Sequence, residues 1–306
     1  MIYKTEFKAM GCQMLAALEY PSPRGSKLLA RVPEWFEAWE ASLSRFRPES
    51  ELNRLNDSPG IAVQVSETLW NVFQASLNAE EQSGGLVTPT LLEALVTAGY
   101  SSSFDQLAPE KVATHSASHL LYPLQAVECW RETLSIRLPA GLHLDFGGVA
   151  KGWVAHQAMQ RLRGYGPALV DAGGDIAISG LQAGGQPWLV GVDDPLHPEA
   201  CLRTLMLGRC GVATSGRDYR RWKQGETWKH HIIDPRTGEP AVTDVLTATV
   251  IAPTVLEAEM AAKVIIILGS QAGRDWLEAR PTFAGMFVTE SGQVVYCRSF
   301  EKYLWE

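Results

Sequence analysis

Residues 143–152, with the sequence H-L-D-F-G-G-V-A-K-G, constrain the fold most, because an acid, a glycine pair and a lysine meet there within one short segment. Apolar and polar residues alternate from 142 to 146, which predicts a strand. Apolar residues recur at helical spacing from 149 to 163 and a glycine follows, which predicts a helix and its end. The glycine pair at 147–148 is predicted to form the tight turn between them with positive φ.

The start of the predicted helix is suited to an anion. Backbone N–H groups point out of a helix N-terminus, and Lys151 in the first turn adds a positive charge, so the junction can hold a group such as a phosphate. A glycine-rich turn between a strand and a helix also has a purely structural role in many proteins. Both interpretations stay open on the residues of the junction alone.

The composition excludes several classes of protein. A chain of 306 residues with a net charge of −7 has no large basic surface for nucleic acid. The five cysteines are odd in number and include no C-x-x-C pair, which favours reduced thiols in the cytoplasm over a disulfide framework or a zinc site. Four clustered cations form either a solvated loop or an anion contact: Arg217, Arg220, Arg221 and Lys223.

Neither an export signal nor a membrane anchor is predicted. Residues 9–12, A-M-G-C, resemble a lipoprotein cleavage box, but Lys4, Glu6 and Lys8 occupy the place of the apolar region that export requires. No stretch approaches the roughly 18 consecutive apolar residues of a membrane-spanning helix. We therefore expect a cytoplasmic protein.

Strand-like and helix-like segments alternate along the chain and predict an α+β architecture with two closely packed lobes. Residues 66–82 form the clearest predicted helix, with a serine N-cap and a glycine stop, and 257–268 form another. Residues 130–145 are predicted to form a hairpin around a turn at 139–141. Residues 101–125 are predicted to form a loop with a short helix.

Several short polar and glycine-rich clusters are spread over the chain, and each is weak evidence alone. In order they are L-S-R-F-R-P-E-S-E-L-N-R-L-N at 43–56, S-G-G-L-V-T-P-T at 83–90, D-F-G-G-V-A-K-G-W at 145–153, D-A-G-G-D-I at 171–176 and H-H-I-I-D-P-R-T-G at 230–238. Together, in this order and spacing, they resemble the segments of the FAD:protein FMN transferase family, also called ApbE-like flavin transferases. The resemblance covers nearly the whole chain.

The resemblance implies a T-fold-like, two-lobed α+β fold with antiparallel sheets and packed helices, in a single domain over residues 1–306. It also implies an enzyme that binds FAD, splits its pyrophosphate with Mg²⁺ and transfers FMN to a Thr or Ser hydroxyl of a target protein. The chemistry is consistent, because a pyrophosphate needs backbone donors, a cation or a metal. Phosphoryl transfer depends mostly on positioning and charge neutralisation.

The resemblance further implies roles for individual residues. The positions that contact the cofactor are Met10, Phe46, Leu86, Val87, Thr88, Asp145, Lys151 and Ile233. The candidates for activating or orienting the attacking hydroxyl are Asp145, His231 and Asp234, and those for stabilising the phosphates are Lys151 and Lys263. The candidate metal ligands are Glu259 and the backbone of Gly148.

Structural roles are the alternative for several of these positions. From the residues alone, Phe46 is at least as well explained by core packing, and residues 234–238 by a turn. His230 would be an exposed loop histidine, and Asp175 would cap neighbouring N–H groups.

The chain departs from the magnesium site that the resemblance implies. Where the family has A-D-x-x-x-T, with the Asp and Thr as metal ligands, this chain has A-E-M-A-A-K at 258–263. A protonated lysine has no lone pair for Mg²⁺, which requires oxygen ligands. Either Lys263 places its ammonium where the metal would sit, held by Glu259, or the two form a surface i,i+4 pair worth about 0.3–0.5 kcal/mol.

Three functions are consistent with this sequence. The first is an FAD-dependent transferase that moves FMN onto a target protein. The second is a protein that binds FAD or hydrolyses its pyrophosphate and has lost the metal-dependent transfer. The third is a structural descendant that binds no flavin.

Overall fold

The computed structural model of the protein describes residues 1–107 and 123–305. The chain divides into two compact units, each assembled from segments distant in sequence. Unit 1 consists of Met1–Phe36, Lys151–Asp218 and Val242–Glu306, and unit 2 consists of Glu37–Ala150 and Tyr219–Ala241. Of residues 101–125, which are predicted to form a loop with a short helix, 108–122 lie outside the described residues.

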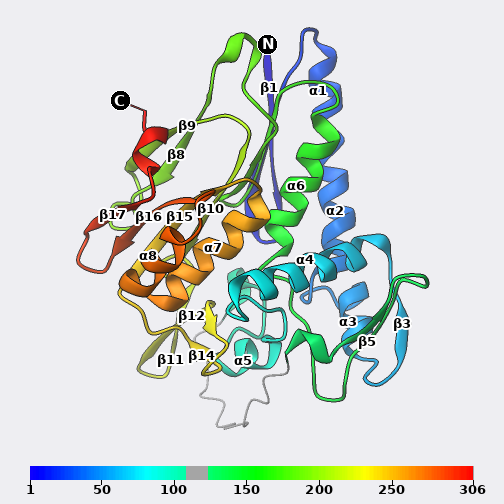
Figure 1. The fold of residues 1–306 in the computed structure, drawn as a ribbon. Helices are drawn as coiled ribbons and strands as arrows, with labels where there is room; N and C mark the ends of the chain where they lie inside the picture. The colour runs from blue at the N-terminus through cyan, green and yellow to red at the C-terminus, as the bar shows by residue number, and fades with distance from the viewer. Residues whose placement is uncertain (108–122, 306) are drawn as a thin grey trace. The chain divides into compact units, whose positions relative to one another are not determined.

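Unit 1 is built on an antiparallel sheet of eight strands in the order β1-β2-β6-β7-β10-β15-β16-β17 (Figure 1). The strands are β1 (Ile2–Ala9), β2 (Cys12–Glu19), β6 (Ala168–Ala172), β7 (Asp175–Ile178), β10 (Cys210–Gly216), β15 (Val245–Ala252), β16 (Ala284–Thr289) and β17 (Val294–Cys297). Since β2 pairs with β6, and β10 pairs with β15, the sheet joins strands from both ends of the chain.

Two helices pack on this sheet. α7 (Val255–Leu268) lies against β10 and β15, and α8 (Ser270–Glu278) packs on α7, as Figure 1 shows in orange. α7 begins at a capping box, in which Thr254 Oγ1 accepts a hydrogen bond from Glu257 N at 3.2 Å and Glu257 Oε2 accepts one from Thr254 N at 2.9 Å. Most of its residues are buried, because the helix is apolar on nearly all sides.

The rest of unit 1 extends this framework. Its other helical elements are α1 (Arg24–Leu29), the first part of α2 (Val32–Leu43), all but the first residue of α6 (Ala150–Leu162), and the short turns η3 (Ala183–Gly185) and η4 (Phe300–Tyr303). A separate hairpin is formed by β8 (Trp188–Asp193) and β9 (Cys201–Leu207). Trp188 and Leu205 of this hairpin join an apolar cluster that includes Val212 and Met286 of the sheet.

Unit 2 combines short helices with small sheets. Its helical elements are α3 (Glu51–Asn56), α4 (Glu67–Ser83), α5 (Leu92–Thr97), η1 (Phe104–Gln106) and η2 (Leu124–Ala126). Its strands are β3 (Ala62–Gln64), β4 (Glu128–Trp130), β5 (Ser135–Arg137), β11 (Arg221–Gln224), β12 (Thr227–His230), β13 (Ile233–Asp234) and β14 (Glu239–Pro240). They form one three-stranded sheet and two hairpins.

The helix predicted for 66–82 is confirmed as α4. Ser66 Oγ accepts a hydrogen bond from Leu69 N at 3.2 Å, which caps the helix start. Gly84 ends the helix in the left-handed conformation, with φ of 66°. Both signals lie within a few residues of the ends that they set, so the sequence was sufficient to place them.

The prediction of a strand at 142–146 is wrong. These residues belong to no strand or helix. The side-chain amide of Asn56 takes the place of a neighbouring strand, since its Nδ2 donates to Leu144 O and its Oδ1 accepts from Leu144 N, each at 2.9 Å. The predicted burial pattern is nevertheless correct, because Leu142, Leu144 and Phe146 are buried.

The turn at the glycine pair also differs from the prediction. Neither Gly147 nor Gly148 has positive φ. The turn is made by Asp145, whose Oδ1 accepts a hydrogen bond from Gly147 N at 2.8 Å. A Cβ on Gly147 would lie 2.8 Å from that oxygen, so the position requires glycine because of space.

The hairpin predicted for 130–145 is displaced toward the N-terminus. β4 and β5 pair across a turn at residues 131–134, and the segment at 139–141 lies beyond β5. The turn residues at 139–141 therefore end a strand rather than connect two.

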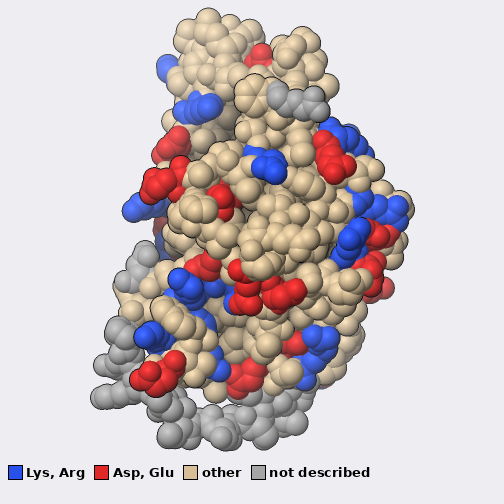
Figure 2. Space-filling view, turned by 90° about the vertical axis from the view of Figure 1, so that its left-hand side faces the viewer, with Lys and Arg blue, Asp and Glu red and all other residues tan. Residues whose placement is uncertain are grey.

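The α+β architecture with antiparallel sheets is confirmed by these elements. Among residues 1–107 and 123–305, no helix has both the length and the apolar character needed to cross a membrane. On the face drawn in Figure 2, acidic and basic side chains are intermixed.

Candidate functional site

Both carboxylate oxygens of Asp145 have contacts within unit 2. Its Oδ2 lies 2.6 Å from Arg45 Nε, and its Oδ1 accepts from Gly147 N. Its backbone N donates to Pro89 O at 2.8 Å, so the junction is tied to the segment at 83–90. Asp145 is therefore a fixed carboxylate whose two oxygens already have partners.

The Phe46 ring packs against the buried guanidinium of Arg45. The guanidinium carbon lies 4.1 Å from the centre of the Phe46 ring. The Phe46 residue is 39% exposed, so core packing does not account for it. An exposed aromatic ring with a fixed support can stack on a planar ligand.

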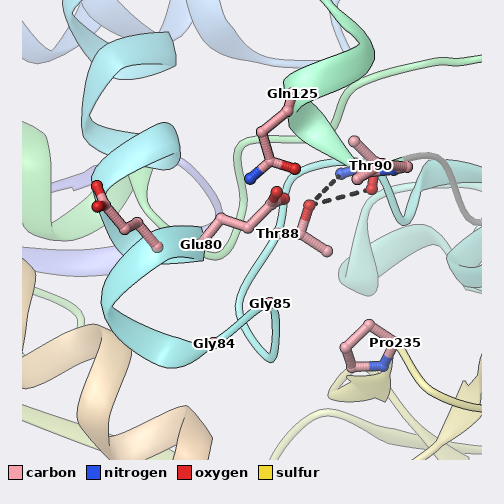
Figure 3. A pocket seen from close by; sticks show the side chains of 9 residues that line it. Glu80, Gly84, Gly85, Thr88, Thr90, Gln125 and Pro235 are labelled. Atoms are coloured by element: carbon pink, nitrogen blue, oxygen red, sulfur yellow. Dashed lines mark hydrogen bonds between the residues drawn. The ribbon is translucent and has the colours of Figure 1, made fainter.

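The segment at 83–90 borders a pocket of about 490 Å³ in unit 2 (Figure 3). Thr88 and Thr90 line it and their hydroxyls lie 3.0 Å apart, while Val87 is buried and Leu86 half-buried. Pro235, from the segment at 230–238, lines the same pocket. Two of the segments that carry the family resemblance thus meet at one cavity.

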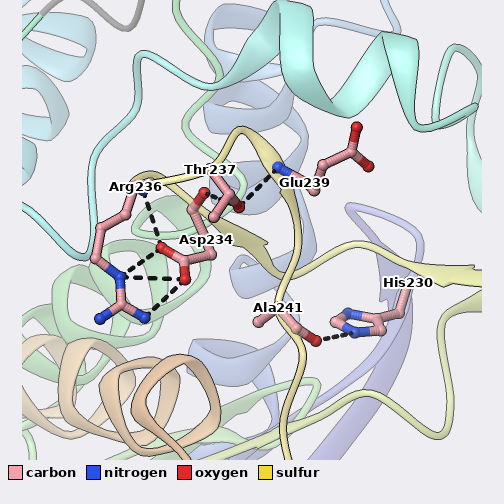
Figure 4. A network of polar contacts seen from close by, with 6 residues as sticks. All are labelled: His230, Asp234, Arg236, Thr237, Glu239 and Ala241. Carbon is pink, nitrogen blue, oxygen red and sulfur yellow. Dashed lines mark hydrogen bonds and ion pairs between the residues drawn. The ribbon is translucent and has the colours of Figure 1, made fainter.

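Asp234 shapes the loop between β13 and β14 (Figure 4). Arg236 Nη2 donates to its Oδ2 at 2.7 Å, and Arg236 N donates to its Oδ1 at 2.9 Å. Burial raises the pKa of Asp234, but the hydrogen bonds from Arg236 outweigh it and hold that pKa below its ordinary value. A carboxylate with a lowered pKa is a weak proton acceptor.

The two neighbouring histidines differ in their surroundings. His230 is buried rather than exposed, with Nε2 3.1 Å from Ala241 O and Nδ1 accepting from Ile232 N at 3.3 Å. These contacts assign the proton to Nε2 and give His230 a structural role. His231 is half-buried. Ile233 is 3% exposed and packs with Ala94, Leu95 and Tyr100 in an apolar cluster, where it supports the loop from behind.

Unit 1 contains a cluster of four charged side chains. Lys151 forms an ion pair with Asp175, and Lys263 Nζ lies 2.9 Å from Glu259 Oε1. Glu259 and Lys263 are 1% and 15% exposed, so the surface-pair interpretation is wrong. Asp175 pairs with Lys151 instead of capping neighbouring N–H groups. Asp171 is the residue that caps an N–H group, since its Oδ1 accepts from Gly174 N at 2.7 Å.

The anion at the N-terminus of α6 comes from the protein itself. Gly152 N donates to Glu259 Oε2 at 3.0 Å. The N–H group that the sequence suggested for a phosphate therefore already binds the carboxylate of Glu259. Burial lowers the pKa of Lys151, but the charges of Asp175 and Glu259 outweigh it and keep that pKa above its ordinary value. Burial and the charge of Asp175 raise the pKa of Glu259, against the effect of Lys263 and Lys151.

The residues of this cluster do not fit a magnesium ion. One Glu259 oxygen accepts from Lys263 and the other from Gly152 N, so a metal ion at this carboxylate would have to displace an ammonium group. Two ammonium groups repel a divalent cation, which prefers six oxygen ligands. Among the residues that the structure describes, no group of three or more His, Cys, Asp or Glu side chains could hold a metal ion. Gly148, the other predicted metal ligand, belongs to unit 2.

Met10 lies in the two-residue turn between β1 and β2. It has φ of 50° and is followed by Gly11 with φ of 67°, the conformation of a tight hairpin turn. Met10 is half-buried, so part of its side chain is accessible.

Asp171 gives the stability of unit 1 a dependence on pH. Burial raises its pKa to about 6, from 3.8. The folded protein therefore holds the proton more tightly than the unfolded chain, and the free energy of unfolding falls as pH rises through this range. Asp171→Asn keeps the acceptor for Gly174 N and removes the titration. We expect the stability of the variant relative to the wild type to increase by about 1.4 kcal/mol between pH 5 and pH 8.

Urea unfolding of both proteins at the two pH values measures this difference. Any effect of the amide itself on the free energy of unfolding is the same at both pH values, so it cancels in this comparison. Equal pH dependence in the two proteins would contradict the raised pKa.

Within each unit the structure brings together part of the predicted set. In unit 1 it joins Lys151, Glu259 and Lys263, and in unit 2 the segment of Thr88 and the segment of Asp234 reach one pocket. Sequence reasoning missed Arg45, which holds Asp145. The only available signal was an arginine directly before the aromatic residue, and it was too weak to indicate burial.

Known proteins resemble this chain over most of its length. The family model described as "ApbE family" matches residues 10–287. The FAD:protein FMN transferase of Treponema pallidum is 29% identical over 297 residues, covering 90% of this chain and 81% of that protein. The FAD:protein FMN transferase of Salmonella typhimurium is 27% identical over 280 residues, covering 88% of this chain and 79% of that protein.

Solved structures share the fold. The ApbE protein of Thermotoga maritima superposes with a TM-score of 0.88 at 23% identity, and covers 100% of both chains. The flavinyl transferase ApbE of Pseudomonas stutzeri superposes with a TM-score of 0.82 at 22% identity, covering 99% of this chain and 96% of that one. These matches confirm the predicted fold. Since the family model spans most of the sequence, the chain belongs to the ApbE family.

Proposed function

We propose that this protein is an FAD:protein FMN transferase, which cleaves FAD and transfers FMN to a Thr or Ser of a target protein. The observation that carries the proposal is the similarity to proteins of that name over about nine-tenths of the chain. Since the family model runs across both units, we also propose that they act as one domain. We also propose a cytoplasmic location, which is supported by the odd number and wide spacing of the five cysteines.

In the proposed reaction the hydroxyl oxygen of the target residue forms a bond to the phosphorus of the FMN half. The bond from that phosphorus to the bridging oxygen breaks, and AMP leaves with its electron pair. The hydroxyl proton passes to a base. Of the candidates, we propose His231 as this base, because imidazole is the usual general base near neutral pH and the hydrogen bonds from Arg236 hold the pKa of Asp234 below its ordinary value.

The remaining predicted residues have supporting roles in this proposal. Phe46, Thr88, Leu86 and Met10 offer accessible surface for the cofactor, while Val87 and Ile233 are buried. Lys151 and Lys263 supply positive charge toward the phosphates. Mg²⁺ has no role in the proposed steps, because the side chains at 259 and 263 do not fit a magnesium site.

The release of AMP tests the proposal. The wild-type protein is incubated with FAD and a Thr- or Ser-containing target protein, and AMP is measured by chromatography. We expect AMP and a mass increase of one FMN on the target in equal amounts, and neither with heat-denatured protein. The absence of FAD binding and of AMP at saturating FAD would reject the function.

A second candidate is favoured by the misfit of the metal site. A protein that binds FAD or hydrolyses its pyrophosphate, without transfer, would share the same pocket. The same experiment separates the two, because hydrolysis yields AMP with free FMN, and binding alone yields neither product.

A further inference from the structure

Arg45 makes four contacts from a buried position. Its side chain is 6% exposed. Its Nε lies 2.6 Å from Asp145 Oδ2, and its Nη2 donates to Tyr100 O at 2.6 Å. Its guanidinium carbon lies 4.1 Å from the centre of the Phe46 ring and 4.9 Å from that of Tyr100. The charged group thus lies against two aromatic rings and one carboxylate.

The backbone that carries Arg45 is fixed independently. Asn53 Nδ2 donates to Arg45 O at 3.0 Å and to Arg47 O at 2.9 Å. Ser50 caps the helix that holds Asn53, with its Oγ accepting from Asn53 N at 3.1 Å. Replacing the Arg45 side chain should therefore leave the path of this loop unchanged.

Tyr100 extends the contact of Arg45 to the β11–β12 hairpin. Its ring stacks on Trp222 with centres 5.4 Å apart and an interplanar angle of 23°. Trp222 Nε1 donates to Ala98 O at 2.8 Å, which fixes the indole. The Phe46 ring meets Tyr100 in an edge contact, with ring centres 5.7 Å apart, so Phe46 lies next to a stack of two rings.

We infer that Arg45 is a positioning residue, which fixes the Phe46 ring and the Asp145 carboxylate together for the bound cofactor. The inference rests on the proposed function, since it takes Phe46 and Asp145 as groups that meet FAD. Arginine suits the position because its planar guanidinium stacks on rings while its N–H groups bond in the plane. A lysine ammonium carries the charge but cannot make both kinds of contact at once.

Three variants test the inference through FAD affinity, measured by quenching of flavin fluorescence. Arg45→Met keeps most of the length of the side chain and removes the charge and the N–H groups of the guanidinium. We expect it to weaken FAD binding about tenfold or more. Arg45→Lys should lie between this variant and the wild type. Arg47→Met is the matched control, because Arg47 lies two residues away and pairs with Glu37 at 2.5 Å near the surface; it should change affinity less than about twofold.

Coupling to Phe46 separates positioning from a general effect on folding. In a Phe46→Ala background, Arg45→Met should weaken FAD binding much less than it does in the wild type. A merely structural role would lower the melting temperature and the folded fraction, and its effect would add to that of Phe46→Ala. If Arg45→Met does not fold, Arg45→Lys is measured in both backgrounds with the same expectation.

The outcomes distinguish this inference from the proposed function. Unchanged affinity in Arg45→Met and Arg45→Lys, or full additivity with Phe46→Ala, would overturn the role of Arg45 while wild-type FAD binding still stands. A wild-type protein that binds no FAD would overturn both.

Discussion

Replacing Lys263 by threonine together with Glu259 by aspartate is expected to make the protein respond to Mg²⁺. The wild type should release AMP from FAD equally well in excess EDTA and in millimolar Mg²⁺. The double variant should lose most activity in EDTA, by about tenfold or more, and recover it with Mg²⁺. Its melting temperature should also rise with Mg²⁺, since a ligand that binds the folded state stabilises it.

The physical reason is the arrangement around Glu259. Its two oxygens accept from Lys263 Nζ at 2.9 Å and from Gly152 N at 3.0 Å, within a buried cluster that also holds Lys151. The ammonium of Lys263 supplies the positive charge and excludes a divalent ion. Threonine removes that charge and offers an oxygen, while the shorter aspartate withdraws from Gly152 N and leaves room for a cation.

Lys263→Arg is the matched control for this experiment. It keeps the positive charge next to Glu259, so its melting temperature should not respond to Mg²⁺. A wild-type protein that EDTA inactivates, or a double variant whose melting temperature ignores Mg²⁺, would refute the replacement of the ion by Lys263.

Gly152→Ala is expected to lower the free energy of unfolding by about 2–4 kcal/mol, although alanine normally favours a helix over glycine. A Cβ at residue 152 would lie 2.5 Å from Glu259 Oε2 and 3.4 Å from Val255 O. The carboxylate would have to move away from Gly152 N, which breaks a charge-assisted hydrogen bond in a buried site. α7 would be pushed away from α6, because both contacts come from α7.

Gly164→Ala provides the comparison for this substitution. Gly164 follows the same helix, has no positive φ, and a Cβ there would meet no atom within 4 Å. Alanine at 164 should be neutral or stabilise the protein by up to about 1 kcal/mol. Urea unfolding of the two variants measures the contrast, and equal stabilities would show that Glu259 adapts without loss.

The sequence predicted the features that neighbouring residues determine. The ends of α4 follow from Ser66 and Gly84, and the Glu259–Lys263 pair follows from its i,i+4 spacing. The order of the motif segments predicted the fold, because those segments are shared with other proteins of the family. All these signals are visible without any knowledge of tertiary contacts.

The predictions that were wrong concern features that depend on contacts between distant segments. The strand predicted at 142–146 is replaced by an irregular segment, in which Leu144 is bound to Asn56, 88 residues earlier. Arg45 reaches Asp145, and Lys151 pairs with Asp175 rather than with an anion at its own helix start. Alternation and spacing describe which side chains are buried, but they carry no information about which partner each buried group finds.

The strand order of the eight-stranded sheet has a consequence for biosynthesis. The hairpin of β1 and β2 is made long before β6, the strand that pairs with β2, and β10 then requires β15 and α7 from the last quarter of the sequence. Ala17 of β2 is 1% exposed in the finished protein and belongs to an apolar cluster that includes Ile251 and Met286. The nascent chain must therefore carry an unpaired edge of β2 until β6 has been made, and chaperones that bind such edges should govern its yield in a cell.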